Sequence, residues 1–95
     1  MIIELDGLSI SSEQDFHKRI ASAFYWAQYY GNNLNSLWDL LSTDVERPIE
    51  IVWKNSKESE QSMGETFKKI ILIFERTENQ DISLGLDEKF EYKLK

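Results

Sequence analysis

The chain has 95 residues, of which 41% are hydrophobic and 13% aromatic, which suffices for one small globular domain over residues 1–95. Seventeen acidic residues against eleven basic ones give a formal net charge of −6. This charge argues against a nucleic-acid partner, because phosphates require a basic surface. The lack of cysteine excludes disulfides and thiolate metal sites, and we see no signal peptide or membrane span. We therefore expect a cytoplasmic protein that does not bind membranes.

The N-terminal half of the sequence predicts one strand and two helices. IIEL, residues 2–5, precedes Asp-Gly and indicates a first strand that ends in a turn. The serine pair 11–12 can cap a helix that runs to about residue 25. In the link that follows, Gly31 suggests a turn with a positive φ. Asn33 is then placed to cap a second helix over about 34–42.

The C-terminal half predicts two further strands and the clearest helix. PIEIVW, residues 48–53, indicates a strand, and the polar segment 54–65 a loop with room for one helical turn. Apolar residues recur at helical spacing in 65–78, and DISLGL, 81–86, has the pattern of a third strand. The tail 86–95 alternates, which fits either an extra edge strand or a frayed end. Strands separated by helices predict an α/β fold with parallel pairing.

No catalytic set can be assembled from the sequence. The single histidine, His17, lies in the first helix and is expected at the surface. Asp6 follows the first strand without the partners that phosphotransfer sites use, so a turn residue is the better interpretation. Glu58 and Glu60 are paired carboxylates in a polar segment and should be solvated. We predict no enzymatic activity, no metal site and no cofactor.

The stretch YYGNNLNSLWDLL, residues 29–41, has the composition of a binding surface. On a helical wheel with about 100° per residue, one apolar side contains Leu34, Leu37, Trp38 and Leu41. A polar flank contains Asn35, Asp39 and Ser42. No lysine or arginine occurs from Ile20 to Val45. The pattern alone allows two interpretations: a charge edged by aromatics, as in a protein-binding hot spot, or ordinary solvated surface.

The same stretch resembles the core motif of the barstar family, Tyr-Tyr-Gly-x-Asn-Leu-x-x-Leu-Trp-Asp. PIEIVW is similar to the second strand of that family, and IILIFERTENQDISL to its last helix and strand. The resemblance covers roughly residues 1–86. It implies a three-stranded parallel sheet packed by three to four helices. It also implies a small bacterial inhibitor or immunity protein that blocks ribonucleases.

In that family the second helix enters the active site of the nuclease, and the resemblance assigns the carboxylate that replaces a substrate phosphate to Asp39. The sequence also departs from the family. Asn35 stands for an aspartate, Asp44 for an aromatic residue and Arg76 for a glutamate, with Glu75 one position earlier. The residues that the resemblance assigns to partner binding are Tyr29, Gly31, Asn33, Leu34, Asn35, Trp38, Asp39, Asp44 and Glu75.

The leading hypothesis is an immunity or antitoxin protein, monomeric when free, that binds a basic nuclease toxin. A ribonuclease is the expected target, and the helix 34–42 and the preceding loop would occlude its active site. The alternative is a barstar-like interaction or regulatory module without a nuclease target. A small phosphate-handling enzyme is a third interpretation, but its motifs are missing from the sequence.

Overall fold

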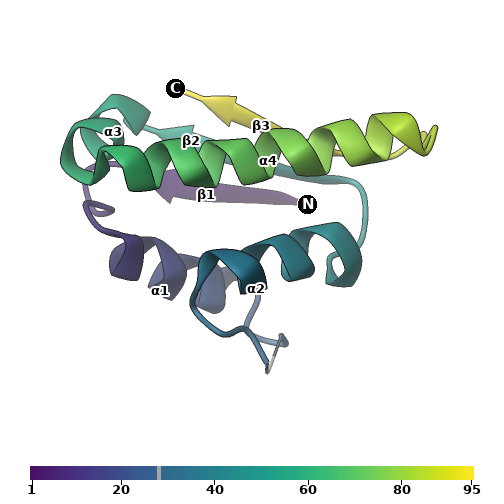
Figure 1. Ribbon diagram of the computed structural model, residues 1–95, viewed down its shortest axis with the longest axis horizontal. Helices are drawn as coiled ribbons and strands as arrows, with labels where there is room; N and C mark the ends of the chain where they lie inside the picture. Colours follow the sequence, from purple (N-terminus) through teal and green to yellow (C-terminus); the bar gives the residue numbers. More distant parts are fainter. Residues whose placement is uncertain (28) are drawn as a thin grey trace.

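The computed structural model describes residues 1–27 and 29–95 and has a three-stranded parallel sheet with its helices on one face (Figure 1). The strands, in the spatial order β1-β2-β3, are β1 (Ile2–Asp6), β2 (Ile49–Lys54) and β3 (Phe90–Leu94). The helices are α1 (Glu13–Ala23), α2 (Leu34–Asp39), α3 (Ser56–Met63) and α4 (Glu65–Ser83), with a π-helical turn, η1 (Leu40–Asp44), directly after α2. The predicted α/β class and parallel sheet are confirmed. No helix in the described residues is long and apolar enough to cross a bilayer.

The inward face of the sheet forms the core. Trp53 of β2 is fully buried at its centre, with its ring stacked on Phe16 of α1 at 5.5 Å between centroids and tilted against Phe67 of α4 at 4.9 Å. The indole N–H of Trp53 donates to Ser59 Oγ at 3.1 Å, and that hydroxyl donates to the carbonyl of Ile10 at 2.7 Å. The central aromatic is therefore packed on its faces and hydrogen-bonded at its edge.

The opposite face of the sheet carries ion pairs between neighbouring strands. Lys54 and Glu4 approach to 3.1 Å, and Lys93 and Glu50 to 3.3 Å. Both pairs join side chains that share this outer face, because residues alternate between the two faces along a strand. One face of the sheet is thus packed by helices and the other is polar.

The third strand lies nine residues later than the sequence pattern suggested, so the prediction of a strand over 81–86 is wrong. α4 continues to Ser83, and β3 begins at Phe90, which pairs with Ile49 of β2. The alternating tail is the edge strand, which was one of the two alternatives for it. The alternation of Ile82 and Leu84 with polar or small residues resembled the pattern of a strand, but both side chains are exposed.

The polar segment after β2 is also more regular than predicted. Residues Ser56–Met63 form the helix α3 rather than a loop with one helical turn. Its buried positions are serines, Ser56 and Ser59, and both hydroxyls hydrogen-bond to backbone carbonyls, of Lys95 and Ile10 respectively. Because these buried residues are polar, the segment shows no apolar periodicity.

Asp6 is a turn residue, as predicted. Its carboxylate accepts from the Leu8 N–H at 2.9 Å and from the Asn55 amide at 3.0 Å, and these two bonds lower the pKa of Asp6. The next residue must be glycine, because a Cβ on Gly7 would lie 1.8 Å from the Asn55 carbonyl oxygen. The end of β1 is thereby fixed against the end of β2.

A buried ion pair joins three segments at the other end of the sheet. Asp81, only 1% exposed, accepts from Arg47 Nε at 2.7 Å and Nη2 at 3.1 Å, and from the backbone N–H of Phe90 at 2.7 Å. Arg47 also donates to the carbonyl of Val45 at 2.8 Å. Burial alone would raise the pKa of Asp81, but the bonds from Arg47 and Phe90 outweigh burial and leave it below its usual value.

The pKa of Asp81 is lower in the folded protein than the value of about 3.9 for an unfolded chain. The Asp81 carboxylate therefore stabilises the fold fully above that unfolded value, and this stabilisation is lost as the pH falls below it and through the folded pKa. We expect Asp81→Asn to lower the free energy of unfolding at pH 7 by about 3 kcal/mol, since it leaves a buried guanidinium without a counter-charge. Urea unfolding should also show that, between pH 7 and pH 3, the variant loses less of its unfolding free energy than the wild type does. Asp87→Asn, at an exposed position, is the control. Equal unfolding free energies for the two variants would contradict this assignment.

Candidate functional site

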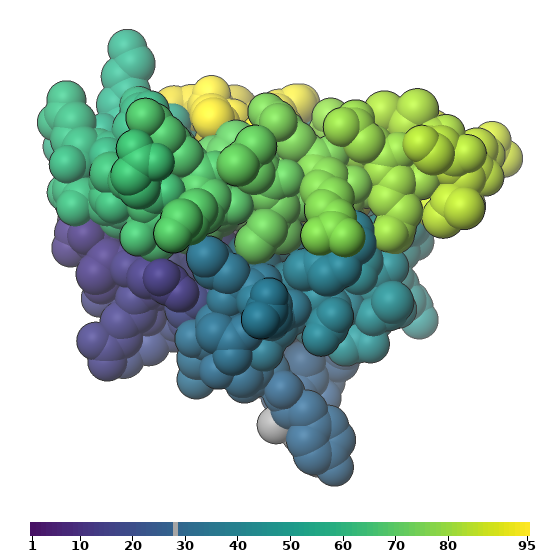
Figure 2. Space-filling model, in the orientation of Figure 1, coloured from purple at the N-terminus to yellow at the C-terminus, as the bar shows by residue number. Residues whose placement is uncertain are grey.

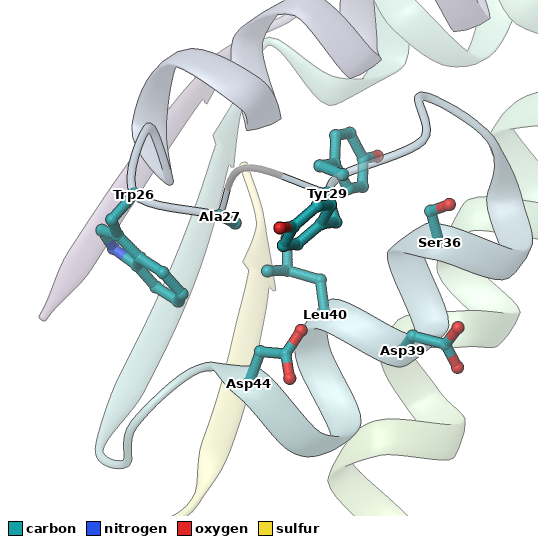
Figure 3. Close-up of a pocket in the computed structure, with 8 residues that line it drawn as sticks. Trp26, Ala27, Tyr29, Ser36, Asp39, Leu40 and Asp44 are labelled. Carbon is teal, nitrogen blue, oxygen red and sulfur yellow. The ribbon is translucent and has the colours of Figure 1, made fainter.

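The connection from α1 to β2 forms an open groove of about 390 Å³ (Figure 3). Trp26 and Tyr29 stand on the loop side, and Leu40 and Asp44 on the helical side (Figure 3). The full lining is Trp26, Ala27, Tyr29, Tyr30, Ser36, Asp39, Leu40 and Asp44. Aromatic and acidic side chains therefore meet in one surface depression.

The helix α2 positions Asp39. Asn33 caps it as predicted, because its side-chain oxygen accepts from the Ser36 N–H at 2.8 Å. Leu37 is fully buried, whereas Leu34 and Trp38 are half-buried at the border. Asp39 is exposed, which is the orientation that the helical wheel predicted. Asn35 is exposed as well and belongs to the same short helix.

A π-helical turn brings a second carboxylate to the groove. The helix predicted over 34–42 is α-helical only to Asp39, and the π-helical turn begins at Leu40. There the Val45 N–H donates to the Leu40 carbonyl, five residues earlier, at 3.1 Å. Five residues advance about 140° around an α-helix. The wider turn reduces this angle, so Asp44 lines the same groove as Asp39. The Thr43 hydroxyl, which donates to the Asp39 carbonyl at 2.6 Å, supports the turn.

The sharp turn before α2 differs in detail from the prediction. The residue with positive φ is Asn32, at 56°, and not Gly31. At Gly31 an added Cβ would lie 2.5 Å from Ser36 Oγ, so a larger residue would force the Ser36 side chain to move. Asparagine is one of the few residues that adopt the left-handed conformation readily. Gly31, Asn32 and Asn33 thus fold the chain tightly onto the start of α2.

His17 is buried, and the prediction of a surface histidine is wrong. It is 3% exposed, and its Nδ1 is hydrogen-bonded to the Tyr30 hydroxyl while Nε2 lies 2.9 Å from a Glu13 carboxylate oxygen. Burial, together with the charge of Glu13, raises the pKa of Tyr30, so its hydroxyl stays protonated. The i, i+4 spacing of Glu13 and His17 was the signal available in the sequence. This chain of bonds ties the loop before α2 to α1.

The structure separates Glu75 from the rest of the predicted set. Its carboxylate accepts from the Tyr92 hydroxyl of β3 at 3.4 Å, and burial together with Glu75 and Glu78 raises the pKa of Tyr92. Its neighbour Arg76 instead places its guanidinium carbon 3.8 Å from the centre of the Trp38 ring. Arg76 therefore stands beside α2, while Glu75 points toward the sheet edge.

The groove adjoins a second hollow, which the sequence analysis did not predict. This hollow, of about 360 Å³, shares Trp26 and Asp44 with the first and is also lined by Met1, Val45 and Glu46. No lysine or arginine lines either hollow among the described residues. Trp26 was missing from the predicted site, although it lies in the same base-free window as Tyr29. The extended groove thus combines three carboxylates with exposed aromatic rings.

The chemistry available here is binding of a cationic group. Carboxylates form charge-assisted hydrogen bonds with guanidinium or ammonium groups, and aromatic faces attract the same cations. In the described residues, no group of three or more His, Asp or Glu side chains is arranged to hold a metal ion. The prediction that this protein needs no cofactor stays a prediction.

The fold and the groove define a small α/β domain with an anionic, aromatic binding surface. The family model described as "Barstar (barnase inhibitor)" matches residues 1–94, and the chain belongs to this family. A protein of Bacillus subtilis (strain 168) named "Putative ribonuclease inhibitor YrdF" is 26% identical over 78 residues, which cover 82% of this chain and 86% of that protein. The resemblance seen in the central motif is thereby confirmed.

The bond between Tyr30 and His17 can be tested with two adjacent tyrosines. Tyr30→Phe leaves a buried ring nitrogen without its hydrogen-bond partner, and we expect the free energy of unfolding at pH 7 to fall by about 1–3 kcal/mol. Tyr29→Phe is the matched control, because the Tyr29 side chain is 94% exposed and should change stability little. Urea denaturation measures both. Equal stability of the two variants would show that the hydrogen bond does not hold the loop.

Proposed function

We propose that this protein is an immunity or antitoxin protein that binds a basic nuclease toxin, a ribonuclease above all, and covers its active site with α2, η1 and the loop before them. It performs no chemistry itself and acts in the cytoplasm as a monomer until it binds. The observation that carries the proposal is the exposed Asp39 carboxylate beside an aromatic groove, in a chain of the family described as barnase inhibitors.

A carboxylate on a fixed helix is suited to a nuclease active site. Such sites bind a polyanion and therefore present cationic groups. Asp39 follows directly on the buried Leu37 and the half-buried Trp38, and Leu40 and Leu41 anchor the next turn in the core. Because the backbone beneath Asp39 is already ordered, little conformational entropy is lost when its carboxylate pairs with a cation.

The aromatic residues supply the apolar part of such an interface. Tyr29 is 94% exposed and Trp26 46% exposed, and both line the groove with Asp39. Tyrosine and tryptophan are enriched in hot spots because they bury a large area with few rotatable bonds. A standard interface buries about 800 Å² on each partner. Tyrosine and tryptophan, which both line the groove, are among the residue types enriched at the centre of such a contact.

The charge distribution favours rapid encounter with a basic partner. The net charge is −6, and the base-free window from Ile20 to Val45 contains the whole primary groove. Complementary potentials raise association rates, and salt screens them. Asp44 and Glu46 extend the negative potential beyond Asp39 along the shared hollows.

A second candidate function is an interaction or regulatory module that has no nuclease target. Two residues favour it: the neutral Asn35 within α2 and the basic Arg76 beside α2, which both lower the anionic character of this surface. Genetic context separates the two. A neighbouring reading frame for a toxin-like protein supports the immunity function, and a consistently unrelated neighbourhood supports the module.

The proposal predicts that Asp39→Ala abolishes capture of a basic nuclease from the source organism. Wild-type and Asp39→Ala proteins serve as paired baits at low salt. Against the captured nuclease, Asp39→Ala should raise the dissociation constant at least about 30-fold, the threshold of a hot spot, because it leaves a cation unpaired. Raising the salt concentration should slow association of the wild type.

Glu58→Ala is the control, since Glu58 is an exposed acid on α3 outside the groove. It removes the same charge from the protein and should change affinity little. If the two substitutions weaken binding equally, or both baits retain the same partners, Asp39 is solvated surface and the module becomes the better account.

Trp26 should contribute to the same interface. We expect Trp26→Ala to weaken binding of the captured nuclease by about tenfold, because it removes one aromatic wall shared by both hollows. Tyr25→Ala is the matched control, since Tyr25 is 83% exposed and lines neither hollow. Isothermal titration calorimetry measures both. A greater loss for Tyr25→Ala would place the interface outside the groove.

A further inference from the structure

A single arginine stands at the border of the anionic surface. The guanidinium of Arg76 lies over the face of Trp38, with 3.8 Å between its central carbon and the ring centre. Within the described residues, the Arg76 side chain forms no hydrogen bond and no ion pair, and the residue is exposed. Its charge is therefore held in place by the indole and is not neutralised by a carboxylate.

The position of Arg76 on α4 directs it toward α2. One helical turn later, the Gln80 amide donates to the Ser42 carbonyl of η1 at 3.3 Å, so this edge of α4 packs along α2 and η1. Figure 2 shows α4, in green, lying directly against the blue and teal segment that contains them. Trp38 immediately precedes Asp39 in the chain. The fixed cation thus borders the face from which the Asp39 carboxylate projects.

A stacked guanidinium keeps its hydrogen-bonding edges free. The cation is attracted to the face of the ring, and the N–H groups lie in the plane of the guanidinium and point outward. Such a group is preorganised for a carboxylate, which it can bind through two parallel hydrogen bonds. Its own neighbours do not offer that carboxylate, because the acid beside it, Glu75, is directed to Tyr92.

We propose that Arg76, held on Trp38, is a specificity-determining residue that selects a partner with an acidic side chain beside its cationic site. The inference rests on the proposed function, since it assumes that Asp39 enters that cationic site. A partner whose rim is cationic throughout meets a like charge at Arg76 and is disfavoured. A partner with a carboxylate at this point gains a charge-assisted pair. Specificity of this kind requires one repulsive contact as well as attractive ones.

The test uses barnase as the probe, because the family is described as barnase inhibitors. The substrate of a nuclease is a polyanion, so its binding site is expected to be cationic. Inhibition constants are measured at low salt for the wild type, Arg76→Lys, Arg76→Gln and Arg76→Glu. We expect inhibition to strengthen in that order of decreasing charge, by about tenfold or more between wild type and Arg76→Glu. Arg76→Lys should stay close to the wild type. Thermal unfolding of each variant verifies folding.

The inference is overturned if the inhibition constants depend on loss of the stacking between residue 76 and Trp38 and not on the charge of residue 76. Equal inhibition constants for Arg76→Gln and Arg76→Glu, tighter binding by the wild type, or no inhibition by Arg76→Glu would each overturn it. Asp39→Ala in the Arg76→Glu background tests the proposed function separately. If this double variant inhibits as well as Arg76→Glu alone, Asp39 does not contribute to binding and the proposed function fails. That conclusion holds even if the charge series at residue 76 behaves as expected.

The same series should run in the opposite direction for the nuclease captured by the wild-type bait. There, Arg76→Glu should raise the dissociation constant more than Arg76→Gln, because it places two carboxylates against each other. An unchanged or lowered dissociation constant for Arg76→Glu would show that the captured partner has no acidic group at this point.

Discussion

The buried ion pair between Arg47 and Asp81 is the contact through which three segments of this fold are held together. Arg47 lies at the approach to β2, Asp81 near the end of α4, and the Phe90 N–H, which also bonds to Asp81, at the start of β3. Arg47 further bonds to Val45, the residue that closes the π-helical turn. One carboxylate therefore connects the sheet to the turn that presents Asp44, and disturbance in either region should reach the other.

The groove depends on a second internal contact at its opposite wall. Tyr30 is tied to α1 through His17, and His17 in turn to Glu13. The leucines of α2 and η1 hold the other wall in the core. Both sides of the groove are thus anchored to the same packed layer before any partner arrives. The backbone that carries Asp39 is therefore held at a defined position in the groove.

The sequence predicted those features whose causes are local. Asn33 and Ser12 cap their helices through their own side chains, and apolar periodicity located α4. Other features depend on distant residues. The start of β3 is held by the Asp81 carboxylate, which accepts from the Phe90 N–H and from Arg47, 34 positions before Asp81. The buried His17 is hydrogen-bonded to Tyr30, 13 positions later. The buried residues of α3 are serines rather than apolar side chains. The π-helical turn leaves no periodic signal, so periodicity does not place Asp44 beside Asp39. Trp26 lies in the loop after α1, where no periodicity relates it to α2.

All residues that line the two hollows, apart from Met1, lie between Trp26 and Glu46, in the single connection from β1 to β2. Within this stretch, Leu37 and Leu41 pack in the core and Asp39 and Asp44 are exposed, while Leu40 contributes to both the core and the groove. A recombination event that exchanged only this segment would carry nearly all of the proposed recognition surface into a related scaffold. Arg76 would stay behind on α4. Transplanted surfaces would then acquire the charge at that position from their new host and, if Arg76 acts as proposed, a new target range with it.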